Sequence, residues 1–285
     1  MGYMHISNLY RPEAQDILLF KECFALEKIH GTSAHVSWSD GQIHLHAGGE
    51  SAVNFAKLFD IEALTNNFLA MGRPKVTIFG EAYGGKQQAQ SWRYGKTLKF
   101  VAFDVHLEDQ WLDVPNAAQF CARLGIEFVH YKRVSTNLAA LDAERDAPSA
   151  QAYLNGVEGD QPREGVVLRP LKEFSLGGHR VICKHKRAEE RETATPRVVD
   201  DPAKLKVLSD AEAIATEWVT PTRLEHVLDK LPGAGMSDTP KVIAAMLEDV
   251  LREGAGELID TPEARKAISK AAALLFKKHV SRVRA

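Results

Sequence analysis

Hydrophobic and polar positions follow two different periods along this chain, and the change between them falls near residue 190. Up to about Arg187, short apolar runs are separated by Gly, Asn, Asp and Pro, which is typical of β-strands joined by turns. Two longer segments between them, SAVNFAKLFDIEAL and VPNAAQFCARLG, have helical spacing. The runs that predict strands are AHVSW, QIHLHA, KVTIFGEAY, LKFVAFDVHL, GIEFVHY, EGVVLRP and HRVICKHK. The pattern predicts an α+β fold with largely antiparallel sheets and flanking helices.

The polar segment RAEERETATPRVVDDP, residues 187–202, contains two prolines and predicts a domain boundary. Beyond it, Thr220, Thr239 and Thr261 each place a capping hydroxyl before a proline, and helical apolar spacing follows each pair. We therefore expect one domain over residues 1–190 and a small all-helical domain over residues 203–285.

Composition places the protein among ordinary globular proteins. The chain has 285 residues, 45% of them hydrophobic, and a net charge of −2. No apolar run approaches the roughly 20 residues of a membrane helix, and the start lacks a secretory signal pattern. The three cysteines are far apart and lack metal-ligand spacing. We expect a reduced, cytoplasmic protein without a membrane partner or structural zinc, acting in the host cytoplasm if it is phage-encoded.

Positive charge predominates at the C-terminal end of the sequence. From Pro262 onward seven basic side chains face a single acid, Glu263. This stretch is consistent with a helix that follows nucleic-acid phosphates, and equally with a solvated helix face.

A lysine in an apolar, β-leaning segment, Lys28, precedes Gly31 by three residues. A Lys-x-x-Gly pattern alone is weak evidence, because about one arises by chance in a chain of this length. Lys230 and Gly233 form the same pattern at a predicted helix end, where the glycine is explained as a stop signal. Lys28 therefore needs corroboration from other segments.

Two segments place possible ligand contacts on predicted strands. Glu81 ends the apolar run of FGEAYGG just before a glycine turn, where a carboxylate reaches a ligand easily. In KFVAFDV, Phe103 and Asp104 are neighbours in a strand, so they are expected on opposite faces.

Two later segments add charges. Glu164 begins REGVVLRP, and alternation predicts it on the face of Val166 and Leu168. In VICKHK the same alternation puts Lys184 and Lys186 on one face, about 6 to 7 Å apart, which suits successive phosphates. Taken singly, each has a structural alternative: a solvated carboxylate, a core phenylalanine, or lysines that protect an edge strand.

The ordered set EKIHGT, FGEAYGG, KFVAFDV, EGVVLRP and CKHK resembles motifs I, III, IIIa, IV and V of the covalent nucleotidyltransferases, which include polynucleotide ligases and capping enzymes. The sequence KIHGT resembles motif I of the RNA ligase 2 type. The resemblance to the superfamily covers residues 21–186. It implies an adenylyltransferase domain, ATP-grasp-like, followed here by helices rather than the OB-fold of DNA ligases.

The resemblance also implies roles for individual residues. Lys28 would attack ATP to form a lysyl-AMP, and Glu164 would hold a divalent metal, Mg²⁺ or Mn²⁺. Glu81 would bind the ribose and Phe103 would stack on adenine. The remaining implied contacts are to the adenine edge from Glu27, Ile29 and Gly31, and to the phosphates from His30, Lys184 and Lys186.

Two departures from the family pattern concern end recognition. Ser33 replaces the expected asparagine, and the arginine expected in the next strand region is absent from QIHLHAGGESAVNF. Arg73 and Arg93 are candidates to replace it. His44 and His46 alternate onto one strand face without a carboxylate partner, so we expect surface residues rather than a metal pair.

Together these features predict an ATP-dependent RNA ligase that joins a 3′-hydroxyl to a 5′-phosphate, with RNA, an RNA–DNA hybrid or a nicked duplex as partner. Two alternatives remain: a DNA or nick-repair ligase of the same superfamily, and a catalytically idle relative that only binds nucleic acid.

Overall fold

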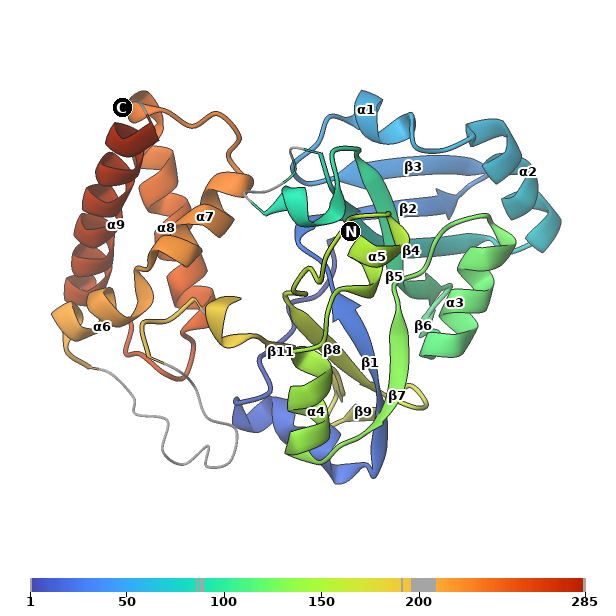
Figure 1. Ribbon diagram of the computed structural model, residues 1–285, viewed down its shortest axis with the longest axis horizontal. Coiled ribbons are helices and arrows are strands. Elements are labelled where there is room, and N and C mark those ends of the chain that lie inside the picture. Colours follow the sequence, from blue (N-terminus) through green and yellow to red (C-terminus); the bar gives the residue numbers. More distant parts are fainter. Residues whose placement is uncertain (1, 86, 88–89, 191, 196–208, 284–285) are drawn as a thin grey trace. The chain divides into compact units, whose positions relative to one another are not determined.

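The computed structural model describes the 285-residue chain except residues 1, 86, 88–89, 191, 196–208 and 284–285 (Figure 1). The chain divides into two compact units, Met1–Arg187 and Ala188–Ala285. Much of the predicted boundary segment, and the predicted first residues of the helical domain, lie outside the described residues. The two units are described one at a time.

A four-stranded sheet carries the predicted nucleophile segment. Its strand order is β11-β8-β1-β7, and every neighbouring pair is antiparallel. β1 lies in its interior, so both edges of that strand are hydrogen-bonded. Its strands are β1 (Glu22–Lys28), β7 (Tyr131–Ser135), β8 (Gly165–Pro170) and β11 (Cys183–Lys186).

A five-stranded sheet of order β3-β2-β4-β5-β6 completes the antiparallel architecture that the sequence predicts, together with a short two-stranded ribbon. Its strands are β2 (Gly31–Ser39), β3 (Gln42–Ala47), β4 (Lys75–Tyr83), β5 (Lys99–Leu107) and β6 (Gln110–Trp111). The ribbon pairs β9 (Ser175–Leu176) with β10 (His179–Arg180).

Helices α1 (Ala52–Ala56), α2 (Ile61–Met71) and α3 (Val114–Arg123) cover one face of the five-stranded sheet (Figure 1). Their apolar side chains join those of the strands in one core, in which the rings of Trp38 and Phe68 stack at 5.3 Å. Burying such a side chain contributes roughly 1.5–3 kcal/mol. The other face of this sheet is left to form a second apolar cluster with β1 and β8.

The remaining helical segments of this unit lie around the four-stranded sheet and its connections. They are η1 (Pro12–Leu19), η2 (Ser91–Tyr94), α4 (Leu138–Arg145) and α5 (Ala150–Leu154). η1 and η2 are 3₁₀ helices.

Three details of the prediction were wrong. The helix expected over residues 51–64 is two helices, because Asp60 caps a new one by accepting a hydrogen bond from the Ala63 backbone N–H. The strand expected over residues 125–131 forms only an isolated bridge from Phe128 to Ala102, and pairing with β1 begins at Tyr131. The run HRVICKHK is split between β10 and β11.

The second unit is helical in its described part, as predicted. Its α-helices are α6 (Ala211–Trp218), α7 (Pro221–Asp229), α8 (Thr239–Glu253) and α9 (Pro262–Val283), with short 3₁₀ turns η3 (Ala188–Glu190) and η5 (Met236–Asp238). Two apolar clusters hold them together, one around Phe276 and one around Trp218. Among the described residues, no helix has the length and apolar character to cross a membrane.

α6 begins after Asp210, whereas the starts of α7, α8 and α9 coincide with the three Thr-Pro pairs, two of which provide the predicted cap. The hydroxyls of Thr220 and Thr261 accept hydrogen bonds from backbone N–H groups three residues later, as a helix cap requires. Thr239 is instead the first residue of α8, and its hydroxyl donates to the Met236 carbonyl of the preceding 3₁₀ turn.

Candidate active site around Lys28

Lys28 is the last residue of β1, and Gly31 is the first residue of β2, so the chain passes from one sheet to the other between them. The Lys28 Nζ donates a hydrogen bond of 2.7 Å to Oε2 of Glu164. The Lys28 side chain is 27% exposed, which leaves the amine accessible to a small molecule. Lys28 is therefore held at the junction of two sheets by its pairing with Gly165 of β8, with part of its side chain exposed.

Glu164 lies at the centre of the predicted site. Its Oε2 binds Lys28, while its Oε1 lies 3.1 Å from Nζ of Lys186. His30 Nδ1 lies 3.6 Å from the same carboxylate. The Glu164 side chain is only 4% exposed, so these contacts occur in a region where charges interact strongly.

The prediction that Glu164 shares a sheet face with Val166 and Leu168 was wrong. In the ladder Lys28 and Lys186 both lie opposite Gly165, whereas Val166 lies opposite Glu27. The carboxylate therefore joins the face opposite to that of Val166 and Leu168. Alternation fails because β8 begins only at Gly165, whose φ of +152° is not a regular strand conformation for other residues.

Two glycines allow the strands to approach closely around this cluster. A Cβ on Gly31 would lie 2.4 Å from the Ala82 carbonyl oxygen and 2.6 Å from Cγ of Glu81. A Cβ on Gly165 would lie 2.2 Å from the His185 carbonyl oxygen. These positions require glycine for space, so Gly31 has a structural reason beyond turn formation.

Glu81 lies beside the cluster, in β4 opposite Ser33 of β2. Burial raises the pKa of Glu81 to about 8, the nearby Lys28 lowers it, and the Glu164 carboxylate raises it further. The Gly31 backbone N–H hydrogen-bonds to Glu81 and favours the ionised form. Two carboxylates and a lysine thus share one electrostatic environment, as the motif order predicts.

The two lysines of β11 share one face of the sheet. Lys184 lies opposite Val167 and Lys186 opposite Gly165, so both point to the side from which Lys28 reaches Glu164. Both are buried or nearly so. A row of three amines on one face suits a polyphosphate.

Phe103 lies in β5 at a bulge. Phe79 of β4 pairs with Asp104, and the next residue, Gly80, pairs with Ala102, so Phe103 has no partner in the ladder. The expectation that Phe103 and Asp104 lie on opposite faces was wrong, because Tyr3 contacts both: its ring lies 4.9 Å from that of Phe103, and its hydroxyl donates to Asp104 at 2.7 Å. Bulges commonly redirect a side chain next to a site.

The Glu27 carboxylate has a structural role. It accepts hydrogen bonds from the Ser149 hydroxyl and from the backbone N–H groups of Ala150 and Gln151 at 2.9 and 3.1 Å, which caps α5. The adenine-edge contact expected of this segment would therefore fall to main-chain groups around Ile29, whose side chain packs in an apolar cluster.

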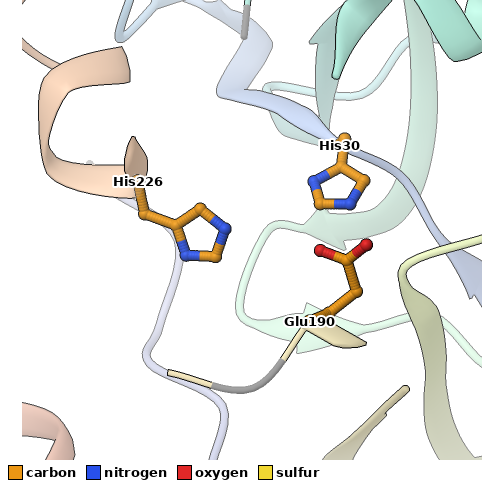
Figure 2. A group of neighbouring side chains, drawn as sticks. All are labelled: His30, Glu190 and His226. Atoms are coloured by element: carbon orange, nitrogen blue, oxygen red, sulfur yellow. The ribbon is translucent and has the colours of Figure 1, made fainter. Parts of the chain in front are cut away.

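His30 follows Lys28 by two residues, and Figure 2 shows its ring. Its backbone N–H donates to the Tyr94 hydroxyl at 3.2 Å, and its ring faces Glu164. Sequence reasoning missed Tyr94, because nothing in SWRYGK connects it with a residue 64 positions earlier. Figure 2 also draws Glu190 and His226 of the second unit, where His226 Nδ1 lies 3.1 Å from Glu192.

The comparisons with known proteins decide the family. The sequence model of the RNA ligase family matches residues 21–186, more than half of the chain. This chain belongs to the RNA ligase family. No curated protein matches it over its sequence.

Solved structures share the fold of this RNA ligase family member. A lysine-to-alanine variant of Naegleria gruberi RNA ligase with ATP and Mn is 16% identical, with a TM-score of 0.52, over 66% of this chain and 57% of that one. The same ligase with PPi is 16% identical, with a TM-score of 0.51, over 66% and 56%. A lysine-to-methionine variant with AMP and Mn is 15% identical, with a TM-score of 0.52, over the same shares. The chain thus spans little more than half the length of these ligases.

The structure also separates the candidates for the arginine that the family pattern expects. Arg73 precedes β4, roughly 20 Å of strand away from Glu81, and lies 3.5 Å from Glu108. Arg93 is adjacent to Tyr94, which binds the His30 backbone. His44 and His46 are exposed on β3, as predicted, and His46 stacks on His35.

Proposed function

We propose that this protein is an ATP-dependent RNA ligase of the RNA ligase 2 type. The observation that carries the proposal is the cluster of Lys28, Glu164 and Lys186, with Glu81 beside it, inside the region that matches the family. Naegleria ligase structures with ATP and Mn, and with AMP and Mn, support a nucleotide and a divalent ion as the cofactors.

In the first step, the Lys28 amine attacks the α-phosphorus of ATP. The N–P bond forms, the bond from the α-phosphorus to the bridging oxygen breaks, pyrophosphate leaves, and the amine loses a proton. The attack needs the lone pair of the amine, whereas in the structure the Lys28 Nζ donates a hydrogen bond to Oε2 of Glu164. Reaction therefore requires that the carboxylate is drawn away from Lys28.

The donor set around Glu164 fits a divalent ion. The buried Glu164 carboxylate lies close enough to Glu81 to raise the pKa of Glu81, and added positive charge would relieve that repulsion. Glu164 would hold Mg²⁺ or Mn²⁺, and the ion would supply charge that offsets the phosphate oxygens and competes with Lys28 for the carboxylate.

The other residues position the nucleotide in this proposal. Lys184, Lys186 and His30 contact phosphate oxygens, and Glu81 accepts hydrogen bonds from the ribose hydroxyls. Phe103 stacks on adenine, while the main chain of residues 27–31 reads its edge. Such transfers depend mainly on positioning and on charge stabilisation, which a buried cluster of fixed cations supplies.

The two later steps use the same lysine. A 5′-phosphate oxygen attacks the adenylate, the N–P bond breaks, and Lys28 regains its proton. A 3′-hydroxyl then attacks the adenylated end, forms the phosphodiester and releases AMP. Arg93, next to Tyr94 and His30, takes the place of the missing arginine in contacting the 5′-phosphate.

The partner in this proposal is RNA, including RNA–DNA hybrids and nicked duplexes, and the reaction takes place in the cytoplasm. Helix α9 supports a nucleic-acid partner with its basic side chains. Arg284, the last of the seven basic residues in this stretch, lies outside the described residues. The buried free cysteines Cys23, Cys121 and Cys183 suit a reducing compartment.

The test is strand joining with a labelled RNA that has a 5′-phosphate, an RNA 3′-hydroxyl acceptor, Mg²⁺ and ATP, compared with GTP and NAD. We expect sealing with ATP, and far less sealing of an all-deoxy pair. Equal sealing of both pairs would support a DNA or nick-repair ligase. RNA binding without any adenylate would support an idle relative.

A further inference from the structure

The segment before the family-matched region contacts both ends of the proposed nucleotide site. Tyr3 lies against Phe103, and residues 7–9 lie along β11 at Lys184. Residues 3–9 precede residue 21, where the family match begins. No role in the reaction follows for them from the motifs.

Tyr3 packs into an aromatic group on the face of the five-stranded sheet that carries Phe103. Its ring lies 4.9 Å from that of Phe103, 5.0 Å from Phe79 and 5.8 Å from Trp111. The contacts with Phe103 and Trp111 are edge-on, the geometry that aromatic pairs prefer. Phe103 stands at a bulge without a ladder partner, so side-chain packing must fix its orientation.

The Tyr3 hydroxyl fixes the ring in turn. It donates a 2.7 Å hydrogen bond to Oδ2 of Asp104, the residue after Phe103. Asp104 is fully buried and is bound by the guanidinium groups of Arg169 and Arg180. Burial raises the pKa of Tyr3 well above its ordinary value, so the hydroxyl keeps its proton and remains a donor.

The same segment reaches the phosphate end through its backbone. The Lys184 N–H donates to the Ser7 carbonyl at 2.9 Å, and the Leu9 N–H donates to the Lys184 carbonyl at 2.8 Å. These bonds place Asn8 beside Lys184 in a parallel bridge. β11 lies at the edge of its sheet, so this pairing covers the backbone of the lysine on its open side.

We propose that residues 3–9 are part of the nucleotide site, with Tyr3 as a positioning residue that sets the Phe103 ring and the Ser7–Leu9 pairing as the support of Lys184. This rests on the proposed function, because Phe103 and Lys184 matter here as nucleotide contacts. Tyr3 itself need not touch ATP.

The test measures single-turnover formation of the protein–AMP adduct against ATP concentration, in the full chain with Mg²⁺. We expect Tyr3→Ala to raise the ATP concentration for half-maximal rate roughly 2- to 10-fold, as loss of one aromatic pair implies. The maximal rate should change by less than about twofold, because Lys28 and Glu164 are untouched. Tyr3→Phe keeps the ring and should restore most of the ATP affinity.

Tyr153→Ala is the matched control, since Tyr153 is 82% exposed and should leave the ATP dependence unchanged. If Tyr3→Ala does not fold, Tyr3→Leu keeps apolar bulk without a ring and decides the question by the same ATP dependence. An unchanged half-maximal concentration in the folded variant, or an equal shift in Tyr153→Ala, would overturn the inference. A wild-type protein that forms no adduct would instead overturn the proposed function.

Discussion

The chain contains the Lys-x-x-Gly pattern twice, and the glycines of the two copies are needed for different structural reasons. Lys28 binds a carboxylate that is 4% exposed, and Gly31 is needed because a side chain there would collide with β4. Lys230 follows α7, is 63% exposed and lies 3.8 Å from Asp249. Gly233 has a φ of +76° and open space around its Cβ position. One glycine provides room and the other provides a turn.

This difference shows what distinguishes the proposed nucleophile from an incidental lysine. The Lys-x-x-Gly spacing is the same, but the first pattern lies where two sheets meet and where β8 and β11 add charges from far along the chain. The second lies at a helix end, where its geometry is complete without contacts from elsewhere.

The largest expected effect is that of Lys28→Ala on adenylation. Because the amine is the proposed nucleophile, adduct formation with labelled ATP should fall by at least about 10³-fold. Lys230→Ala is the control and should retain wild-type adduct formation. An adduct that survives the first change, or is lost with the second, would reverse the assignment of the two lysines.

The glycines should respond next most strongly. Gly31→Ala places a Cβ against the Ala82 carbonyl and Glu81, so adduct formation should fall by about 10²-fold through misplacement of Lys28 and Glu81. Gly233→Ala should lower the free energy of unfolding by about 1–2 kcal/mol, through its positive φ alone, and leave adduct formation intact. Adduct yield and denaturant unfolding measure the two effects; full adenylation by Gly31→Ala would refute the close-approach argument.

Two buried carboxylates extend the comparison. Glu164→Gln should reduce adduct formation by roughly 10- to 100-fold and raise the Mg²⁺ concentration required, since it weakens a proposed metal ligand. Asp249→Asn removes one of the two carboxylates that pair with the buried Arg223, the other being Glu192, and should lower the stability of the second unit by about 3 kcal/mol. Adduct formation by folded Asp249→Asn should match wild type. Equal loss of adenylation in the two variants would contradict the assignment of Glu164 to the site and of Asp249 to stability alone.

The remaining expected effect is a change in the pH dependence of stability at Glu81. Its pKa is raised from an ordinary 4.5 to about 8, so the folded protein holds a proton that the unfolded chain has lost. Stability should therefore fall as pH rises from 4.5 to 8, and Glu81→Gln should flatten that slope because glutamine does not ionise. Melting temperatures across this range provide the measurement. Parallel profiles for the two proteins would contradict the raised pKa.

Much of this molecule was readable from its sequence, because periodicity and turn residues determine strands such as KVTIFGEAY and QIHLHA, which match β4 and β3. Features that depend on residues far apart in the sequence could not be predicted in this way. The bulge at Phe103 depends on how β4 pairs with β5, and the face of Glu164 depends on where β8 begins.

The side-chain roles show the same limit. EKIHGT drew attention to Lys28 and Glu27 together, but the Glu27 carboxylate caps a helix more than 120 residues away. Tyr3 and Tyr94 carry no local signal that connects them with Phe103 or His30. Sequence reveals which residue types are present in which order, whereas long-range pairing decides which of them meet.

The most direct test of the central claim identifies the residue that carries AMP. The protein is incubated with ATP and Mg²⁺, digested, and the modified peptide is sequenced by mass spectrometry under conditions that preserve the N–P bond. The account predicts a single AMP on Lys28. An AMP on Lys184, Lys186 or Lys230, or a wild-type protein that carries none, would contradict it.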